Sequence, residues 1–258
     1  MTEIEWARLK ASEIAGLAKR NAIVILPIGS TEQHGPHLPT QVDSRLATEV
    51  AHRAARIMSR THPAVVAPTI PYGMSEHHMS LSGTITLDYA TMAAVLNCAC
   101  ESILRHGFKR IFVLNGHGGN TEGVYTFVTE FTVKHRVPIC GGTYWNIAQA
   151  EIAAILEKQK YLLHACEAET SMMLALTPEL INRDELSQMH GPYITGLSAI
   201  AGVNAGVYRW RQLSSRSPIG VIGEAGAASP EKGQKLLEAI PAAVARALLE
   251  EKLWSEPI

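Results

Sequence analysis

The residues best suited to chemistry lie in one short stretch, 29–37, and at Asp43 just beyond it. Glu32, His34 and Asp43 place two carboxylates and one imidazole within a few positions of each other. In an extended segment, residues two apart point the same way, so Glu32 and His34 can be directed at one point. Two metal ligands would be arranged in this way. The alternative is a solvated pair in a surface loop, and for Asp43 it is the N-cap of a following helix.

A second polar segment, residues 115–120, has the sequence Asn-Gly-His-Gly-Gly-Asn and also follows an apolar run. It lacks the Lys-Ser/Thr of a P-loop and does not fit GxGxxG, so phosphate binding is not indicated. His117 alone could be a structural histidine. Carboxylates and imidazoles gathered at one sheet edge are costly to desolvate unless a positive charge neutralises them, which a divalent ion would do. Mixed carboxylate and imidazole donors favour Zn, Mn or Fe, and Asp43 is the natural candidate to bridge two ions.

The elements that must position these residues alternate along the chain. Apolar runs predict strands, and amphipathic or apolar segments between them predict helices. This order predicts an α/β fold with a mostly parallel sheet and helices on both faces, in which ligands bind beyond the carboxyl ends of the strands. With no repeat or linker, one domain over residues 1–258 is expected. The expected strands are 22–28, 64–68, 110–114 and 137–142; the expected helices are 5–20, 43–59, 88–106, one ending near 157, 172–176 and 229–253, with a loop-dominated region at 190–228.

Composition narrows the class of partner. The 258 residues are 47% hydrophobic and 18% charged, with a formal net charge of -1, so neither nucleic acid nor an anionic membrane is expected as a partner. No apolar stretch is long enough for a membrane span, and the amino terminus lacks the pattern of a secretory signal. The four cysteines follow no CxxC spacing, which favours a reducing cytoplasm. A small-molecule substrate is expected.

Several motifs, in order and spacing, resemble the creatininase (creatinine amidohydrolase) family from residue 22 to about residue 235. The resemblance implies a metal-dependent amidohydrolase with a three-layer α/β/α fold that usually assembles as a hexamer and binds one or two divalent ions. The motifs are Gly-Ser-Thr-Glu-Gln-His-Gly at 29–35, Asp43, Asn-Gly-His-Gly-Gly-Asn at 115–120, His164 with Glu-Thr-Ser at 169–171, and Glu-Lys-Gly at 231–233.

By position, the resemblance implies that Glu32 and His117 bind one ion, that His34 binds the other, and that Asp43 bridges them. The ions would lower the pKa of a bound water and polarise the amide carbonyl, while His164 would carry a proton to the leaving nitrogen. Trp145 matches an active-site tryptophan of creatininase, and His78 matches a recurrent histidine of the family. The residues placed beside the substrate are Ser75, His78, Gly118 and Trp145.

Two departures from the family pattern concern the ligands and the substrate. Creatininase has a glutamate, serving the second metal, where this chain has Gly119. Glu169 is the first choice to replace this glutamate, and it is expected to be both a metal ligand and a catalytic residue. The alternative is that Glu169 only orients a metal ligand or lies at the N-terminus of a helix as a favourable charge. Glu122 and Glu167 are weaker choices. Residues 81–84 read Leu-Ser-Gly-Thr in place of Phe-Pro-Gly-Thr, which argues against creatinine as the substrate.

The predicted function is hydrolysis of a C-N amide bond in a lactam, a formamide or a small linear amide. The family resemblance is compatible with three kinds of enzyme: a ring-opening lactamase, a deformylase of a formylamino-pyrimidine nucleotide, and a peptidase. Arg209, Arg211 and Arg216 could bind the phosphate of a nucleotide, although exposed loop arginines are the commoner case. The alternative from another class is a non-catalytic metal-stabilised scaffold or binding protein, which the glycine at position 119 would favour.

Overall fold

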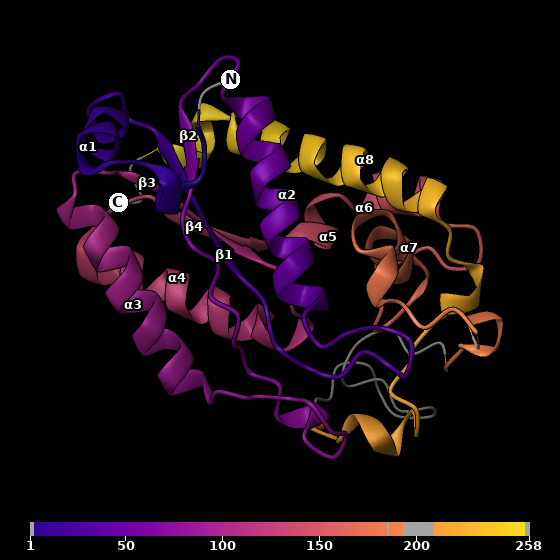
Figure 1. The fold of residues 1–258 in the computed structure, drawn as a ribbon. Helices are drawn as coiled ribbons and strands as arrows, with labels where there is room; N and C mark the ends of the chain where they lie inside the picture. Colours follow the sequence, from indigo (N-terminus) through magenta and orange to yellow (C-terminus); the bar gives the residue numbers. More distant parts are fainter. Residues whose placement is uncertain (1–2, 185, 193–208, 256–258) are drawn as a thin grey trace.

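The computed structural model describes residues 3–184, 186–192 and 209–255. Its helices and strands alternate along most of the chain (Figure 1). They are α1 (Ala11–Lys19), β1 (Ile23–Ile28), α2 (Val42–Met58), β2 (Ala64–Val66), α3 (Tyr89–Arg105), β3 (Arg110–Asn115), α4 (Thr121–His135), β4 (Ile139–Thr143), α5 (Tyr144–Ile147), α6 (Gln149–Ile155), α7 (Glu167–Leu176) and α8 (Pro230–Leu248).

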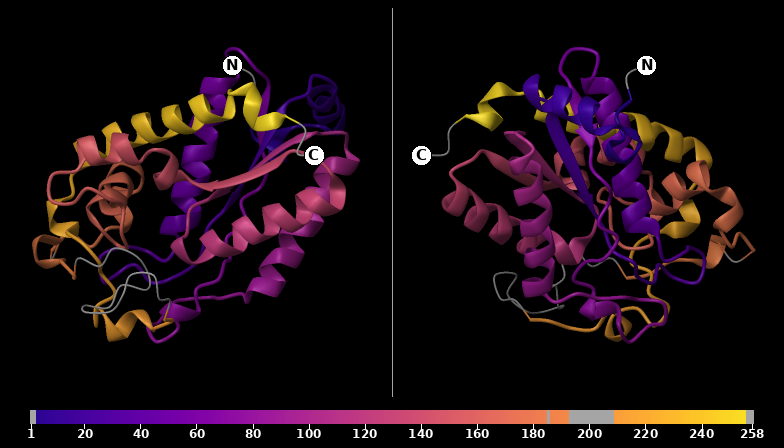
Figure 2. Two further views of the ribbon diagram at one scale, coloured as in Figure 1. Left: turned by 180° about the vertical axis from the view of Figure 1, so that it is seen from behind. Right: turned by 60° about the vertical axis from the view of Figure 1, so that its left-hand side comes forward.

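The four described strands form one parallel sheet in the order β2-β1-β3-β4. Helices cover both faces, so the molecule has the three layers that the sequence predicts (Figures 1 and 2). Side chains alternate across β1: Ile23 and Ile25 pack with α2, α7 and α8, whereas Val24 and Leu26 pack with α1, α3 and α4. Because both faces of the sheet are covered, its strands are continuous apolar runs. The predicted α/β/α fold is confirmed.

Several helix boundaries differ from the sequence prediction. Segment 5–20 is a short 3-10 turn followed by α1, and the last helix ends at Leu248 rather than near 253. Asp43 is not an N-cap, because α2 begins at Val42 and Asp43 lies in its first turn. α7 begins at Glu167, well before the predicted start at residue 172. Of the predicted loop region at 190–228, residues 193–208 lie outside the described residues.

The first residue of α7, Glu167, carries a buried carboxylate. Glu167 is fully buried and accepts hydrogen bonds from the backbone N–H groups of Glu157, Lys158 and Gln159 at 3.0, 3.1 and 3.4 Å. Lys232, in the first turn of α8, donates to it at 2.8 Å. Glu167 is therefore a structural anchor between the loop after α6 and two helices. The Glu-Lys-Gly motif thus contributes a countercharge, and its Gly233 lets α8 approach the Ser171 carbonyl of α7 more closely than a Cβ would permit.

Lys232→Met is expected to lower the free energy of unfolding by about 3 kcal/mol, because it leaves the Glu167 carboxylate buried without its cation. Denaturant unfolding measures this loss. Lys235→Met is the matched control: Lys235 lies exposed on the same helix, and its replacement is expected to cost less than about 0.5 kcal/mol. Equal unfolding midpoints for the two variants would contradict the anchoring role of Glu167.

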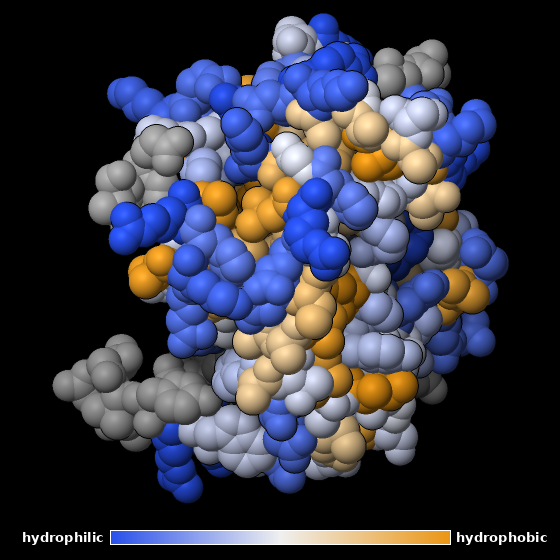
Figure 3. Space-filling model, turned by 90° about the vertical axis from the view of Figure 1, so that its left-hand side faces the viewer, coloured by the Kyte–Doolittle hydropathy of each residue, from blue (hydrophilic) through white to orange (hydrophobic). Residues whose placement is uncertain are grey.

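None of the described helices is both long and apolar enough to cross a lipid bilayer. On the face seen from the left of Figure 1, hydrophobic side chains form a band between hydrophilic ones (Figure 3).

Candidate metal centre

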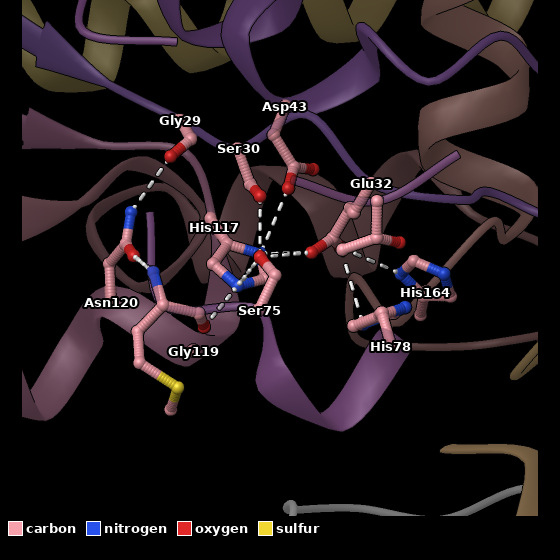
Figure 4. Close-up of polar contacts among 12 residues, drawn as sticks. Gly29, Ser30, Glu32, Asp43, Ser75, His78, His117, Gly119, Asn120 and His164 are labelled. Carbon is pink, nitrogen blue, oxygen red and sulfur yellow. Dashed lines mark hydrogen bonds and ion pairs between the residues drawn. The ribbon is translucent and has the colours of Figure 1, made fainter. Parts of the chain in front are cut away.

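The polar segments predicted to carry chemistry meet at the carboxyl ends of the strands. Residues 29–34 follow β1, the loop 67–87 follows β2, and residues 115–120 end β3 and lead into α4. α2 contributes Asp43 and α7 contributes Glu169, each from its first turn. Figure 4 shows how Glu32, Asp43 and His117 converge from three of these elements.

One group of potential ligands consists of Glu32, Asp43 and His117. Nδ1 of His117 lies 3.2 Å from Oε2 of Glu32 and 2.9 Å from Oδ2 of Asp43 (Figure 4). One donor atom from each residue lies within 4.8 Å of the others. The structure therefore brings together the three residues expected to share one ion.

A second group consists of His34, Asp43 and Glu169. Nε2 of His34 lies 3.2 Å from Oδ1 of Asp43 and 3.9 Å from Oε1 of Glu169. Asp43 thus directs one oxygen toward each group, which is the position a bridging carboxylate requires. Glu169, the first choice in the sequence analysis to replace the missing glutamate, is the third member of this group and comes from the start of α7.

Backbone carbonyls fix the orientation of both imidazoles. Nε2 of His117 donates to the Met74 carbonyl at 3.0 Å, and Nδ1 of His34 donates to the Glu32 carbonyl at 3.2 Å. The other ring nitrogen of each histidine therefore faces the carboxylates. Such an outer hydrogen bond is the usual device that orients a metal-binding histidine.

Two asparagines hold the loops that carry His117. The Asn115 side chain accepts from the backbone N–H of His117 at 3.0 Å and donates to its carbonyl at 2.7 Å. The Asn120 side chain accepts from the backbone N–H of Met74 at 2.9 Å and donates to the Gly29 carbonyl at 3.0 Å (Figure 4). Asn120 therefore ties together the loops that follow three different strands.

Ser75 is fully buried behind the ligands and is not among the described residues that line the cavity. Its hydroxyl donates to Oε2 of Glu32 at 2.8 Å and also contacts Ser30 and Nε2 of His117 (Figure 4). In this arrangement it orients Glu32. Of the four residues expected beside the substrate, His78, Gly118 and Trp145 line the cavity, whereas Ser75 lies behind Glu32.

Gln33 contacts two further histidines of the site, His78 and His164. Its side-chain amide donates to Nδ1 of His78 at 2.9 Å. Nε2 of His164 donates to the Gln33 carbonyl at 3.0 Å, so Nδ1 of His164 faces Oε1 of Glu32 at 3.6 Å. The sequence analysis missed this role of Gln33, although its place between Glu32 and His34 was a signal.

The charged groups of the site are buried, so their desolvation costs free energy. Glu32, His34, Asp43, His117 and Glu169 are each at most 3% exposed. Burial raises the pKa of Glu32 and of Glu169. Burial alone would lower the pKa of His117, but the charges of Glu32 and Asp43 raise it to about 10. Burial alone would also lower the pKa of His34, but Asp43 and Glu169 raise it well above its usual value. These shifts indicate that a positive charge stabilises the buried carboxylates of the cluster.

The donor atoms themselves fit a metal ion. Within the described part of the chain, Nε2 of His34, Oδ2 of Asp43 and Oε2 of Glu169 are buried without a hydrogen bond. Buried polar atoms are normally paired, so these three need another partner. A divalent ion would provide one, and nitrogen with carboxylate oxygen is a donor set that suits Zn, Mn or Fe.

The two weaker candidates for the missing ligand lie elsewhere. Glu167 is bound by Lys232 and three backbone N–H groups, as described above. Glu122 is exposed and lines a neighbouring cavity. Of the three glutamates considered for this role, Glu169 is the one that contacts His34.

Packing explains the glycine at position 119. A Cβ there would lie within 2.5 Å of Nε2 of His117 and 2.8 Å of Cε1 of His77, and closer still to the Met74 carbonyl. The neighbouring Gly118 has open space around its Cβ position. A glutamate therefore has no room at position 119 in this structure.

Gly119→Ala is expected to destabilise the protein by about 1–3 kcal/mol, because the added methyl group must displace His117 or the Met74 peptide. Its metal affinity should fall as well, since His117 is a candidate ligand. Gly118→Ala is the matched control and should change both quantities much less. Thermal unfolding and metal titration of the two variants test this, and indistinguishable variants would argue against the packing explanation.

The cluster opens into a cavity of about 190 Å³. Beside the ligand candidates, its wall includes the apolar side chains of Trp145, Leu162, Leu163, Leu213 and Ile222. A larger cavity of about 390 Å³ shares Trp145, Leu162 and Leu163 with it but contains none of the five ligand candidates. The polar cluster with an apolar wall is typical of a small-molecule site.

Comparison with known proteins identifies relatives over most of the chain. The family model Creatininase, described as creatinine amidohydrolase, matches residues 7–248. The mycofactocin precursor peptide peptidase of Mycobacterium ulcerans (strain Agy99) is 30% identical over 223 residues, covering 83% of this chain and 79% of that protein. The creatinine amidohydrolase of Pseudomonas putida is 29% identical over 272 residues, covering 96% of this chain and 95% of that protein.

Solved structures of creatininase have the same fold. A manganese form superposes with a TM-score of 0.80 at 26% identity and covers 97% of this chain and 99% of that one. A mutant of the Zn-Zn type has a TM-score of 0.81 at 26% identity, with coverage of 97% and 99%.

Proposed function

The chain belongs to the creatininase family, and on that premise we propose that it is a metal-dependent amidohydrolase of small lactams, formamides or linear amides. The observation that carries this proposal is the pair of ligand groups that share Asp43. The named relatives, a peptidase and a creatinine amidohydrolase, support hydrolysis at an amide bond.

In the proposed site, Glu32 and His117 hold one ion, His34 and Glu169 hold the other, and Asp43 joins them. A divalent ion bound there would supply Lewis acidity toward the amide carbonyl and lower the pKa of a water. Zinc, manganese or iron is proposed; the zinc and manganese forms of creatininase support the first two.

His164 is proposed to move the proton. Its Nε2–H is engaged by the Gln33 carbonyl, so Nδ1 is the atom that can take up a proton and give it to the leaving nitrogen. His164 lines the cavity, as a residue in this role must. His78, Gly118 and Trp145 are proposed to bind the substrate.

We also propose a single domain, a cytoplasmic location and a homo-oligomer, with a hexamer expected from the family resemblance. Both apolar clusters pack on the same sheet, which supports one domain. All four cysteines are free, which is consistent with a reducing compartment. Analytical ultracentrifugation tests the assembly.

The decisive experiment measures metal content and then amide hydrolysis. The purified protein is expected to hold one or two divalent ions per chain. It should hydrolyse members of a panel of lactams, formamides and short peptides, and lose this activity on chelation and regain it with added zinc or manganese. Bound metal without hydrolysis of any panel member would instead favour the non-catalytic scaffold.

A further inference from the structure

A second cavity of about 270 Å³ adjoins the cavity of the metal centre. His77 and Arg216 line both cavities and so form the wall between them. His77 lies on the metal-centre side next to His117, with the two rings nearly parallel and their centroids 5.6 Å apart. The outer cavity adds aromatic side chains, Tyr89 and Trp210. Arg216 and His77 therefore separate the metal centre from an aromatic surface.

The position of Arg216 is set by its own backbone. Arg216 follows the 3-10 turn Leu213–Ser215, and its N–H donates to the Leu213 carbonyl at 2.8 Å. The Leu213 side chain is buried. This turn lies against the 3-10 turn Glu76–His78, which carries His77, and a hydrogen bond of 2.7 Å joins the hydroxyls of Ser80 and Ser214 (Figures 1 and 2). Arg216 is thus fixed relative to the ligand loop.

The charge of Arg216 distinguishes it from the rest of the wall. Among the described residues that line the inner cavity, it alone is a lysine or arginine; the others are ligand candidates, histidines, a glycine or apolar residues. A guanidinium is always charged and offers a planar fork that matches an oxyanion. A guanidinium has five N–H donors, so Arg216 can offer some of them to an oxyanion that arrives with the substrate in addition to the contacts it makes within the protein.

We propose that Arg216, beside His77, binds an anionic oxygen group, a carboxylate or a phosphate, carried by the amide substrate. This inference rests on the proposed function and narrows its substrate class. The scissile amide would lie at the metal centre and the anionic group at the wall between the cavities. Neutral amides such as simple lactams would then be poor substrates.

The test uses zinc-loaded protein and matched pairs of amides. 5-Oxoproline is compared with 2-pyrrolidinone, and N-formylglycine with N-formylglycinamide; N-formylaminomethylphosphonate serves as the phosphate-like member. Dissociation constants are measured by calorimetry and kcat/KM by product formation. Wild-type protein is expected to favour the anionic member of each pair by at least about 30-fold. A stronger preference for the phosphonate would identify a phosphate as the group recognised, and a stronger preference for 5-oxoproline or N-formylglycine would identify a carboxylate.

Arg216→Met should remove this preference while zinc content and melting temperature stay unchanged. Arg211→Met is the matched control, because Arg211 lines the outer cavity but not the inner one, and it should keep the preference within about threefold. Should Arg216→Met fail to fold, Arg216→Gln and Arg216→Lys replace it, and the lysine variant should retain part of the preference.

The outcomes separate this inference from the proposed function. Hydrolysis of neutral and anionic amides at equal rates, or a preference that survives in Arg216→Met because the carboxylate binds zinc, overturns the anion site and leaves the hydrolase standing. Anion binding that depends on Arg216, without hydrolysis of any amide, supports the anion site and refutes the proposed function. If neither amide hydrolysis nor anion binding that depends on Arg216 is observed, both proposals are overturned.

Discussion

Asp43→Ala is expected to remove most of the bound metal from a protein that remains folded. Asp43 directs one carboxylate oxygen toward His117 and the other toward His34, so its loss removes a donor from both groups at once. Loss of even an outer-shell partner lowers metal affinity by about 10- to 100-fold, and loss of a shared ligand should exceed about 100-fold. Metal content after dialysis, measured beside circular dichroism, tests this.

The control for this variant is Asp184→Ala, because Asp184 is exposed and is in none of the ligand groups. It should keep the wild-type metal content. Near-stoichiometric metal in Asp43→Ala would rule out the bridging role. If alanine unfolds the protein, Asp43→Asn keeps the shape of the side chain and removes its charge, and it should show the same loss.

His164→Ala is expected to lower turnover by about 10²–10⁴-fold, the usual contribution of a positioned general acid-base group. Metal content should remain that of the wild type, because His164 is not a member of either group around Asp43. Rate measurements on the best substrate of the amide panel, together with metal analysis, give both quantities.

His190→Ala is the control for His164→Ala, since His190 is exposed and is not among the described residues that line the cavity. It should retain full activity. Unchanged turnover in His164→Ala would exclude proton transfer by His164. A simultaneous loss of metal would show that His164 acts as a ligand instead, a reading that its membership in a group with Glu32 and His34 makes testable.

Local sequence was sufficient for the sheet. Apolar runs at 22–28 and 110–114 predicted strands that the structure places at Ile23–Ile28 and Arg110–Asn115. Parallel strands buried on both faces are apolar throughout, so their pattern does not depend on distant contacts. The buried ion pair between Glu167, at the start of α7, and Lys232 could not be found in this way, because the two residues are 65 positions apart.

In the site, too, some features follow from local sequence and others depend on distant contacts. The residue types and the strand ends predicted that Glu32, His34, Asp43 and His117 share a site, and the resemblance to the creatininase family added Glu169. Their supporting contacts were not predictable, because they depend on how separate loops meet. Ser75 is 43 positions from Glu32, and Gln33 is 131 from His164. Sequence spacing gives no measure of such distances, and Ser75 in particular faces the ligands rather than the cavity.

The hydrogen bond from the Met74 backbone to Asn120 has a consequence for redesign of position 119. Because it helps to hold the Met74 carbonyl over Gly119, a glutamate introduced at position 119 alone is expected to displace His117 or the loop after β2. An additional ligand at this position therefore requires a redesign of that loop, so position 119 and the path of the loop after β2 have to be changed as one unit.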